Sequence, residues 1–150
     1  MAYTGSLAGI GLGSVLSIGD GASPVGYTPV GELTELNQSG RQAGTDDVTN
    51  FESGAREFLP TLIDSGTWAF TGNRIGGDTG QIAMETAFTG LHLRSFTITL
   101  PKTASQTVSG DSCTFTALVE QLNYTIGVDK AVKVQGQLKV SGILTWSAGS

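Results

Sequence analysis

Carboxylates gather in the stretch GTDDVTNFESGAREFLPTL, residues 44–62, beside two phenylalanines. Asp46, Asp47 and Glu52 are its candidates for general acid–base chemistry. Neighbouring side chains of an extended chain point to opposite sides, so Asp46 and Asp47 are poorly placed to share one proton. The stretch has neither a helical nor a strand period. It is interpreted as a solvated acidic loop or, more specifically, as a contact between subunits, with catalysis as the third alternative.

Nucleophilic and metal chemistry lack partners elsewhere in the chain. His92 is the single histidine available as the base of a catalytic triad, and no Gly-x-Ser-x-Gly turn accompanies it. Cys113 is the single cysteine, and one Cys with one His cannot complete a zinc site. The segment DGASPVGYTPVGE lacks the alternating carboxylates of a calcium loop. The sequence therefore predicts no catalytic residues, no metal and no cofactor.

Two glycine-rich turns match anion-binding motifs only in part. GIGLG at 9–13 has no predicted strand before it and no helix after it, so a flexible N-terminal arm explains it better. NRIGGDTGQ at 73–81 opens a predicted helix, whose free N–H groups could hold an anion. Asp78 already caps that helix and would repel a phosphate. Both turns are therefore interpreted as structural.

Composition narrows the class of protein further. The 150 residues hold 13 Asp and Glu against 8 Lys and Arg, a net charge of −5. This charge argues against a nucleic-acid-binding surface and against binding to an anionic membrane. The N-terminal residues hold neither a basic leader nor a continuous apolar run, so we expect neither a signal peptide nor a membrane helix. A chain of this length fits one domain with its own core.

Strand-like periodicity dominates the chain. In AVKVQGQLKVSGILTW, residues 131–146, apolar and polar side chains alternate, which predicts a strand about twice the usual length. A second long strand is predicted in SCTFTALVEQLNYTI, residues 112–126, joined to the first by a short turn around GVDK. One face of this second strand is expected to hold Leu118, Leu122, Tyr124 and Ile126, interrupted by Glu120. Shorter strands are predicted in SFTITLP, GTWAFTG, PVGELTEL and SVLSIGDG.

A helix is predicted among these strands at about 78–90. Asp78 is a suitable N-cap, and Gln81 three residues later completes a variant of the capping box. Apolar residues then recur at helical spacing: Met84, Ala87, Phe88 and Leu91. The expected fold class is mainly β, a β-sandwich or barrel with one flanking α-helix. We expect a single domain over 1–150, with the N-terminal arm, a long loop at about 40–63 and a short C-terminal tail.

Several segments follow one another in a specific order. TDDVTNFESGAREFLPTLIDSGTWAFTGN is followed by DTGQ opening the helix, then by FTITLP and finally by VKVQGQLKVSG. This order resembles the major tail tube protein of long-tailed, siphovirus-type bacteriophages. GLGSVLSIGDGASPVGYTPVGELTEL is similar to the opening of that family, so the resemblance covers nearly the whole chain. One departure is Thr61, where the family pattern leads us to expect glycine.

The resemblance implies a structural virion protein and no enzyme. Such a protein self-assembles into stacked hexameric rings that form the hollow tail tube, the conduit for DNA ejection into the host. Its partners would be further copies of itself, the tape-measure protein, the tail terminator and the baseplate or tip proteins. DNA would pass through the lumen without specific binding, and no membrane is involved. The protein would be assembled in the bacterial host cytoplasm and located in the virion tail.

Two sets of residues have expected roles in such a tube. In this family the long loop between early strands reaches a neighbouring subunit, which implies interface roles for the matching residues: Asp46, Asp47, Phe51, Glu52, Arg56, Phe58 and Leu59. The apolar members would be buried anchors, and the charged members would set the register. The polar face of the long C-terminal strand, or of its partner strand, is the candidate lumen face: Lys133, Gln135, Gln137, Lys139 and Glu120. A face without net positive charge would let DNA slide instead of binding it.

Two other classes of protein stay open at this point. A monomeric β-sandwich binding module, of the fibre or carbohydrate-binding type, is the main alternative. It would favour exposed aromatic platforms, yet the chain holds two Trp and three Tyr. A hydrolase is the third class, and a single histidine leaves it without a nucleophile–base pair.

Overall fold

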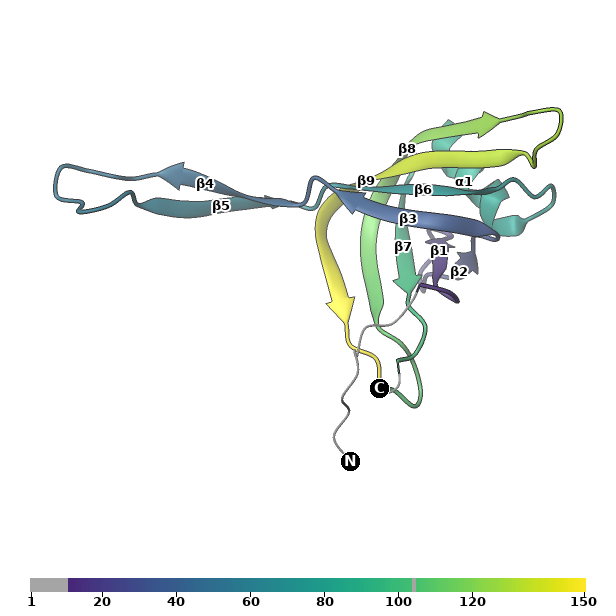
Figure 1. Cartoon of the computed structure of the whole chain (residues 1–150), viewed down its shortest axis with the longest axis horizontal. Coiled ribbons are helices and arrows are strands. Elements are labelled where there is room, and N and C mark those ends of the chain that lie inside the picture. Colours follow the sequence, from purple (N-terminus) through teal and green to yellow (C-terminus); the bar gives the residue numbers. More distant parts are fainter. Residues whose placement is uncertain (1–10, 104) are drawn as a thin grey trace.

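The computed structural model describes residues 11–103 and 105–150. The predicted N-terminal arm lies mostly in residues 1–10, outside the described residues. The described elements are β1 (Val15–Gly19), β2 (Tyr27–Pro29), β3 (Leu33–Ser39), β4 (Gln42–Asp47), β5 (Phe58–Asp64), β6 (Thr67–Asn73), α1 (Thr79–Thr89), β7 (Leu93–Thr99), β8 (Ser112–Thr125) and β9 (Lys133–Ser147). A mainly β fold with one helix among the described residues is therefore confirmed (Figure 1).

The strands of the body form one antiparallel sheet, in the order β2-β1-β7-β8-β9-β6-β3. β8 and β9, of 14 and 15 residues, belong to both halves of this sheet. The first half of β8 pairs with β7, whereas the first half of β9 pairs with β6. The sheet bends along these two strands, so its halves enclose one core in the manner of an orthogonal sandwich. It stays open, because β2 and β3 are its two edges.

Two bulges interrupt the long strands and decide which side chains are buried. On β9 the pairing shifts around Gly142, whose φ of 86° is the left-handed conformation that glycine adopts readily. On β8 the pairing shifts between Val119 and Gln121, after which Leu122 takes the buried position. The prediction that Leu118 and Leu122 share a face is therefore wrong, because the bulge inserts one residue between them.

Aromatic rings join the two halves of the sheet across the core. Phe115 of β8 stacks on Trp68 of β6, with ring centroids 6.1 Å apart, and on Phe96 of β7 at 5.7 Å. Met84 and Ala87 of α1 pack into the same core. Two residues of the predicted helical stripe are thus buried. The last residue of the predicted stripe, Leu91, lies beyond the helix end with a φ of 54° and is exposed.

Gln81 of α1 connects three segments of the chain in the interior. Its side-chain Oε1 accepts from the Ile75 N–H at 3.0 Å. Its Nε2 donates to the carbonyls of Gly31, at 3.0 Å, and Asn73, at 2.8 Å. The Asp78 carboxylate caps the helix by accepting from the Gln81 N–H at 2.9 Å, as the sequence predicts. The buried amide therefore satisfies backbone groups of two loops at the start of the helix.

Gln81→Ala is expected to lower the free energy of unfolding by about 3 kcal/mol, because buried backbone groups lose their partners. For a domain of this size we expect Tm to fall by about 6–12 °C. Gln121→Ala, at an exposed position of β8, is the matched control and should change stability by less than about 0.5 kcal/mol. Thermal melts followed by circular dichroism measure both. Equal Tm values for the two variants would contradict the role given to Gln81.

Candidate assembly surfaces

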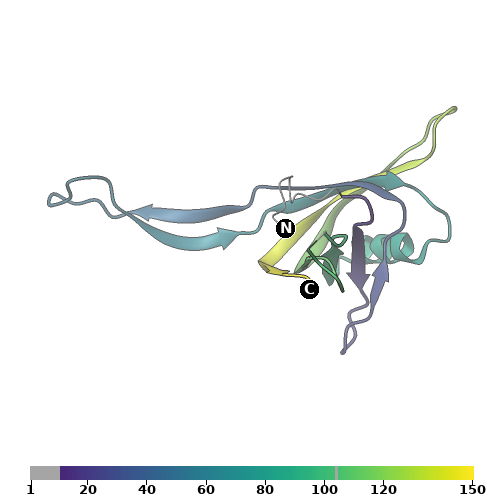
Figure 2. The ribbon, with the colours of Figure 1, turned by 60° about the horizontal axis from the view of Figure 1, so that its bottom comes forward.

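β4 and β5 form a two-stranded arm that projects far from the body (Figures 1 and 2). The arm approaches the body at its base, where β5 contacts β9. All residues of β5, and all of β4 but one, are exposed. The stretch that was interpreted as a loop without a strand period is therefore a hairpin arm. Its period is hidden because apolar side chains lie on both faces of the ribbon.

The pairing register assigns the arm residues to faces. Asp47 lies opposite Phe58, and Asp46 lies opposite Leu59. Directly opposed residues share a face, so Phe58 and Leu59 point to opposite sides of the ribbon. Each face thus carries a large exposed apolar side chain beside an aspartate. Asp46 and Asp47 also point to opposite sides, which fits their expected failure to act as a pair.

A bulge near the base of the arm accounts for the departure at Thr61. The pairing shifts between Ala43 and Thr45, so Gly44 faces two residues of β5. A Cβ at Gly44 would collide with the Thr61 hydroxyl and lie 3.1 Å from the Leu62 carbonyl oxygen. The glycine that the bulge requires stands on the opposite strand. Thr61 is therefore compatible with the turn geometry of this ribbon.

The arm tip, residues 48–57, is ordered by its own hydrogen bonds. The Thr49 N–H donates to Asp47 Oδ1 at 2.9 Å, and hydrogen bonds from Thr49 hold the pKa of Asp47 below its usual value. The Glu57 N–H donates to the Thr49 hydroxyl at 2.9 Å. The Ser53 hydroxyl donates to the Glu57 carboxylate at 2.8 Å. The tip keeps a defined shape although its side chains pack against nothing in this chain.

The residues predicted for the subunit interface all lie on this arm, and all are exposed: Asp46, Asp47, Phe51, Glu52, Arg56, Phe58 and Leu59. Arg56 lies 3.7 Å from the Asp47 carboxylate, and exposure makes such a pair weak. Leu62, which is 86% exposed, and Ile63 extend the apolar surface, and the sequence analysis missed both. The signal was present in FLPTLI, where four apolar residues surround Pro60 and Thr61.

A polar face covers β3, β6, the first half of β9 and the second half of β8. The predicted lumen residues of β9 lie on it, next to polar residues of the neighbouring strands. Directly opposed residues form two rungs across this half-sheet: Asn37–Ala69–Gln137–Gln121 and Glu35–Thr71–Gln135–Asn123. Hydroxyl and amide groups therefore dominate the surface. The rungs depend on the register between strands, so the members outside β9 could not be found from periodicity alone.

This polar face carries few charges, and both signs are present. Lys139 and Lys133 lie at its two ends, and the Lys133 ammonium donates to Asn73 Oδ1 at 2.7 Å. Glu35 lies on the same face, and Glu120 is exposed in the bulge of β8. Two carboxylates thus offset two ammonium groups. Helix α1 packs into the apolar core on the other side of the sheet, so the polar face is left uncovered.

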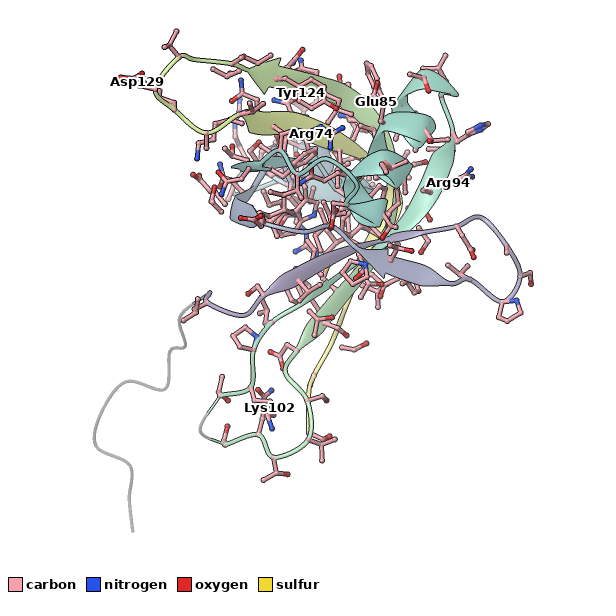
Figure 3. The ribbon with its side chains drawn as sticks, turned by 90° about the vertical axis from the view of Figure 1, so that its right-hand side faces the viewer. Arg74, Glu85, Arg94, Lys102, Tyr124 and Asp129 are labelled. Carbon is pink, nitrogen blue, oxygen red and sulfur yellow. The ribbon has the colours of Figure 1, made fainter. Side chains whose placement is uncertain are left out.

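The polar half-sheet has two free lateral edges. β3 pairs with β6 on one side and forms the edge of the sheet on the other. β7 pairs with β8 only from Ser112 to Leu118, so β8 has a free edge beyond Leu118. Near this edge the Tyr124 hydroxyl donates to Glu85 at 2.9 Å, and Arg74 lies over the ring (Figure 3). Burial, together with Glu85, raises the pKa of Tyr124.

The residues weighed for catalysis are not brought together. His92 is exposed just after α1, whereas Cys113 is fully buried in the core. Burial raises the pKa of the Cys113 thiol to about 11, which keeps it protonated and unreactive. Within residues 11–103 and 105–150, no group of three or more His, Cys, Asp or Glu could hold a metal ion. None of the helices in that part of the chain is long and apolar enough to cross a lipid bilayer.

Comparisons with known proteins identify the fold of this chain. Neither a family model nor a curated protein matches the sequence. The SPP1 tail tube structure is 18% identical with a TM-score of 0.67, covering 91% of this chain and 77% of that one. The tail of a gene transfer agent, refined with C6 symmetry, is 19% identical with a TM-score of 0.66, covering 89% and 96%. The tube-terminating cap of the anti-feeding prophage is 13% identical with a TM-score of 0.71, covering 99% and 95%. The chain therefore has the tail tube fold, as the resemblance implied.

Phe58→Asp is expected to leave the chain folded and monomeric, because Phe58 packs against nothing in the body and an aspartate opposes burial at an interface. Thermal melts should match those of the unaltered chain, and sedimentation should show no assembly. Phe58→Leu keeps the apolar surface and should assemble. This control distinguishes the effect of the added charge from the effect of losing the aromatic side chain. Normal tubes from Phe58→Asp would remove this position from the interface.

Proposed function

We propose that the protein is the structural subunit of a hollow tail tube through which DNA leaves a virion. The observation that carries the proposal is the polar half-sheet with two free edges and balanced charge. The tail tube fold of the solved relatives supports it. An exposed strand edge invites pairing with another chain, and a ring of copies would pair both free edges of the polar half-sheet. The free edge of β3 would meet the free edge of β8 in the next copy.

The width of such a ring is compatible with six copies and excludes three. Each copy would contribute four strands, so six would give about 24 strands, which at about 4.8 Å each close into a backbone circle about 37 Å across. About 5 Å of side chain on each wall leaves a channel of about 27 Å, which passes a double helix. Three copies would leave only about 8 Å. The C6 symmetry with which the gene transfer agent tail was refined agrees with the larger ring.

The polar face suits a channel wall over which DNA slides. DNA binds a protein surface mainly through release of counterions by Lys and Arg. Lys133 and Lys139 are offset by Glu35 and Glu120, so this release would gain little free energy. The amide and hydroxyl groups of the rungs can bind water instead. The proposed channel wall therefore includes the residues that the sequence predicted for the lumen, Gln135 and Gln137 among them.

The arm would supply the contacts between copies in this tube. Its two apolar faces have no cover in the chain itself, and their burial by neighbours would stabilise the assembly. A terminator at one end of the tube, baseplate or tip proteins at the other and a tape-measure protein in the lumen would complete the tail. Assembly would take place in the host cytoplasm, before the tail joins the virion.

Electron microscopy with size-selective thiol labelling tests this function. Concentrated protein in negative stain should show tubes with a stain-filled channel. Gln137→Cys should react with a small maleimide in tubes and be protected from a maleimide on a large polyethylene glycol, because the channel excludes the polymer. Thr86→Cys, exposed on α1, should react with both reagents. Monomers at every concentration, or equal polymer labelling at both positions in tubes, would count against the proposal.

A further inference from the structure

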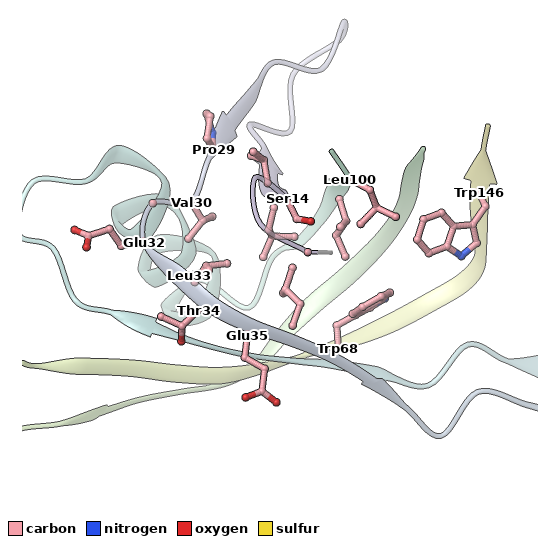
Figure 4. Close-up of a pocket in the computed structure, with 16 residues that line it drawn as sticks. Ser14, Pro29, Val30, Glu32, Leu33, Thr34, Glu35, Trp68, Leu100 and Trp146 are labelled. Atoms are coloured by element: carbon pink, nitrogen blue, oxygen red, sulfur yellow. The ribbon is translucent and has the colours of Figure 1, made fainter. Parts of the chain in front are cut away.

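A groove opens into the core where the bent sheet fails to close. It lies between β3 and the strands β1 and β7, and β9 lines its far end (Figure 4). Its lining is largely apolar: Leu16, Leu33, Leu36, Leu100, Trp68 and Trp146. The Glu35 side chain points away from it, toward the polar face. No other residue within 11–103 and 105–150 covers this part of the hydrophobic core, which is distinct from the polar face and from the arm.

Two buried polar groups of residues that line this groove have no partner among the described residues. Trp68 is 8% exposed, and its indole Nε1–H meets no hydrogen-bond acceptor among the described residues. The hydroxyl of Ser14, which also lines the groove, is likewise buried without a partner there. Buried donors in native proteins are almost always satisfied. These polar atoms are covered by the chain itself, so the apolar lining of the groove is what selects an occupant, and it favours an apolar side chain.

We propose that the groove receives the tip of the β4–β5 arm from a second copy, with Phe51 as the inserted side chain. This inference rests on the proposed function and names the receptor of the arm. Phe51 is fully exposed at the apex of the tip, where it contacts no part of the core. The tip is already ordered by hydrogen bonds such as that from the Ser53 N–H to the Asn50 carbonyl at 3.0 Å. Such preorganisation lowers the entropic cost of binding.

The donor of this tip is another copy and not the same chain. The arm leaves the body beside β9 and extends away from it, so its tip lies remote from the groove (Figures 1 and 2). Arms and grooves occur once per copy, which lets each copy give one arm and receive one. The contact is head-to-tail and can repeat through a ring or along a tube.

Charge at the groove rim agrees with the proposed occupant. Glu32 is exposed on the β3 side of the rim. Arg56 is the basic residue of the arm tip. Its partner within the chain is an exposed carboxylate at 3.7 Å, so Arg56 can exchange this partner for a rim glutamate at little cost. The acidic residues of the tip would then point outward into solvent.

Disulfide trapping tests the pairing directly. In a Cys113→Ser background, Phe51→Cys chains are mixed with Leu33→Cys chains, assembled and mildly oxidised. Leu33 lines the groove, so a covalent mixed dimer is expected. Phe51→Cys mixed with Thr86→Cys is the control and should stay monomeric on a denaturing gel. Tubes that form without enrichment of the Phe51–Leu33 dimer overturn the inference and leave the proposed function intact. Absence of tubes from the unaltered chain counts against the proposed function instead.

Tryptophan emission gives a second readout on the unaltered protein. Both tryptophans of the chain line the groove, and Trp146 is 43% exposed. Insertion of Phe51 should shift the emission to shorter wavelength on assembly and reduce quenching by iodide severalfold. Phe51→Ala should lack both changes at equal protein concentration. Assembly of the unaltered chain with unchanged iodide quenching means that another partner, or none, covers the groove, and contradicts the inference.

Discussion

The antiparallel pairing of β8 with β9 is the constraint on which the other features depend. These strands run side by side through both halves of the sheet, and the bulge at Gly142 lets β9 turn from one half into the other. The base of the arm is attached at this bend. The Ser65 hydroxyl donates to the Gly142 carbonyl at 2.6 Å, and the Val140 N–H donates to the Gly66 carbonyl at 3.1 Å. The arm therefore leaves the body where the sheet bends, and its direction is fixed by the same bonds.

Local signals in the sequence were enough for most elements of the body. Alternation located β9 and β8, and the cap at Asp78 located the start of α1 within one residue. The register between strands left no such signal, because pairing depends on residues far apart in the chain. The polar rungs and the reversed face of β8 after Val119 therefore appeared only in the structure. The short strand β2 was missed for a different reason, because a strand of three residues is too short to show alternation.

The arm shows a different limit of sequence analysis. A strand is recognised from alternation because one face is buried and the other is solvated. On β5 apolar residues occupy both faces, so Phe58 and Leu59 break the pattern, and the bulge near Leu62 shifts it once more. The composition was still informative. Exposed aromatic and aliphatic residues with few neighbours are unfavourable in a lone domain, and this reasoning led from the sequence to an interface instead of an active site.

Order in the arm and assembly of the tube follow from one balance of free energy. A two-stranded hairpin without a third strand or a helix against it is at best marginally stable in water. The arm has neither, and its contact with the body is confined to its base. Its hydrogen bonds define a shape, and in the proposed tube the burial of Phe58, Leu59 and their neighbours would come from other copies. In the proposed tube, each contact that orders an arm would also add a subunit. Part of the free energy that orders the arm would then come from polymerisation, which would couple the fold of the arm to the concentration of the protein.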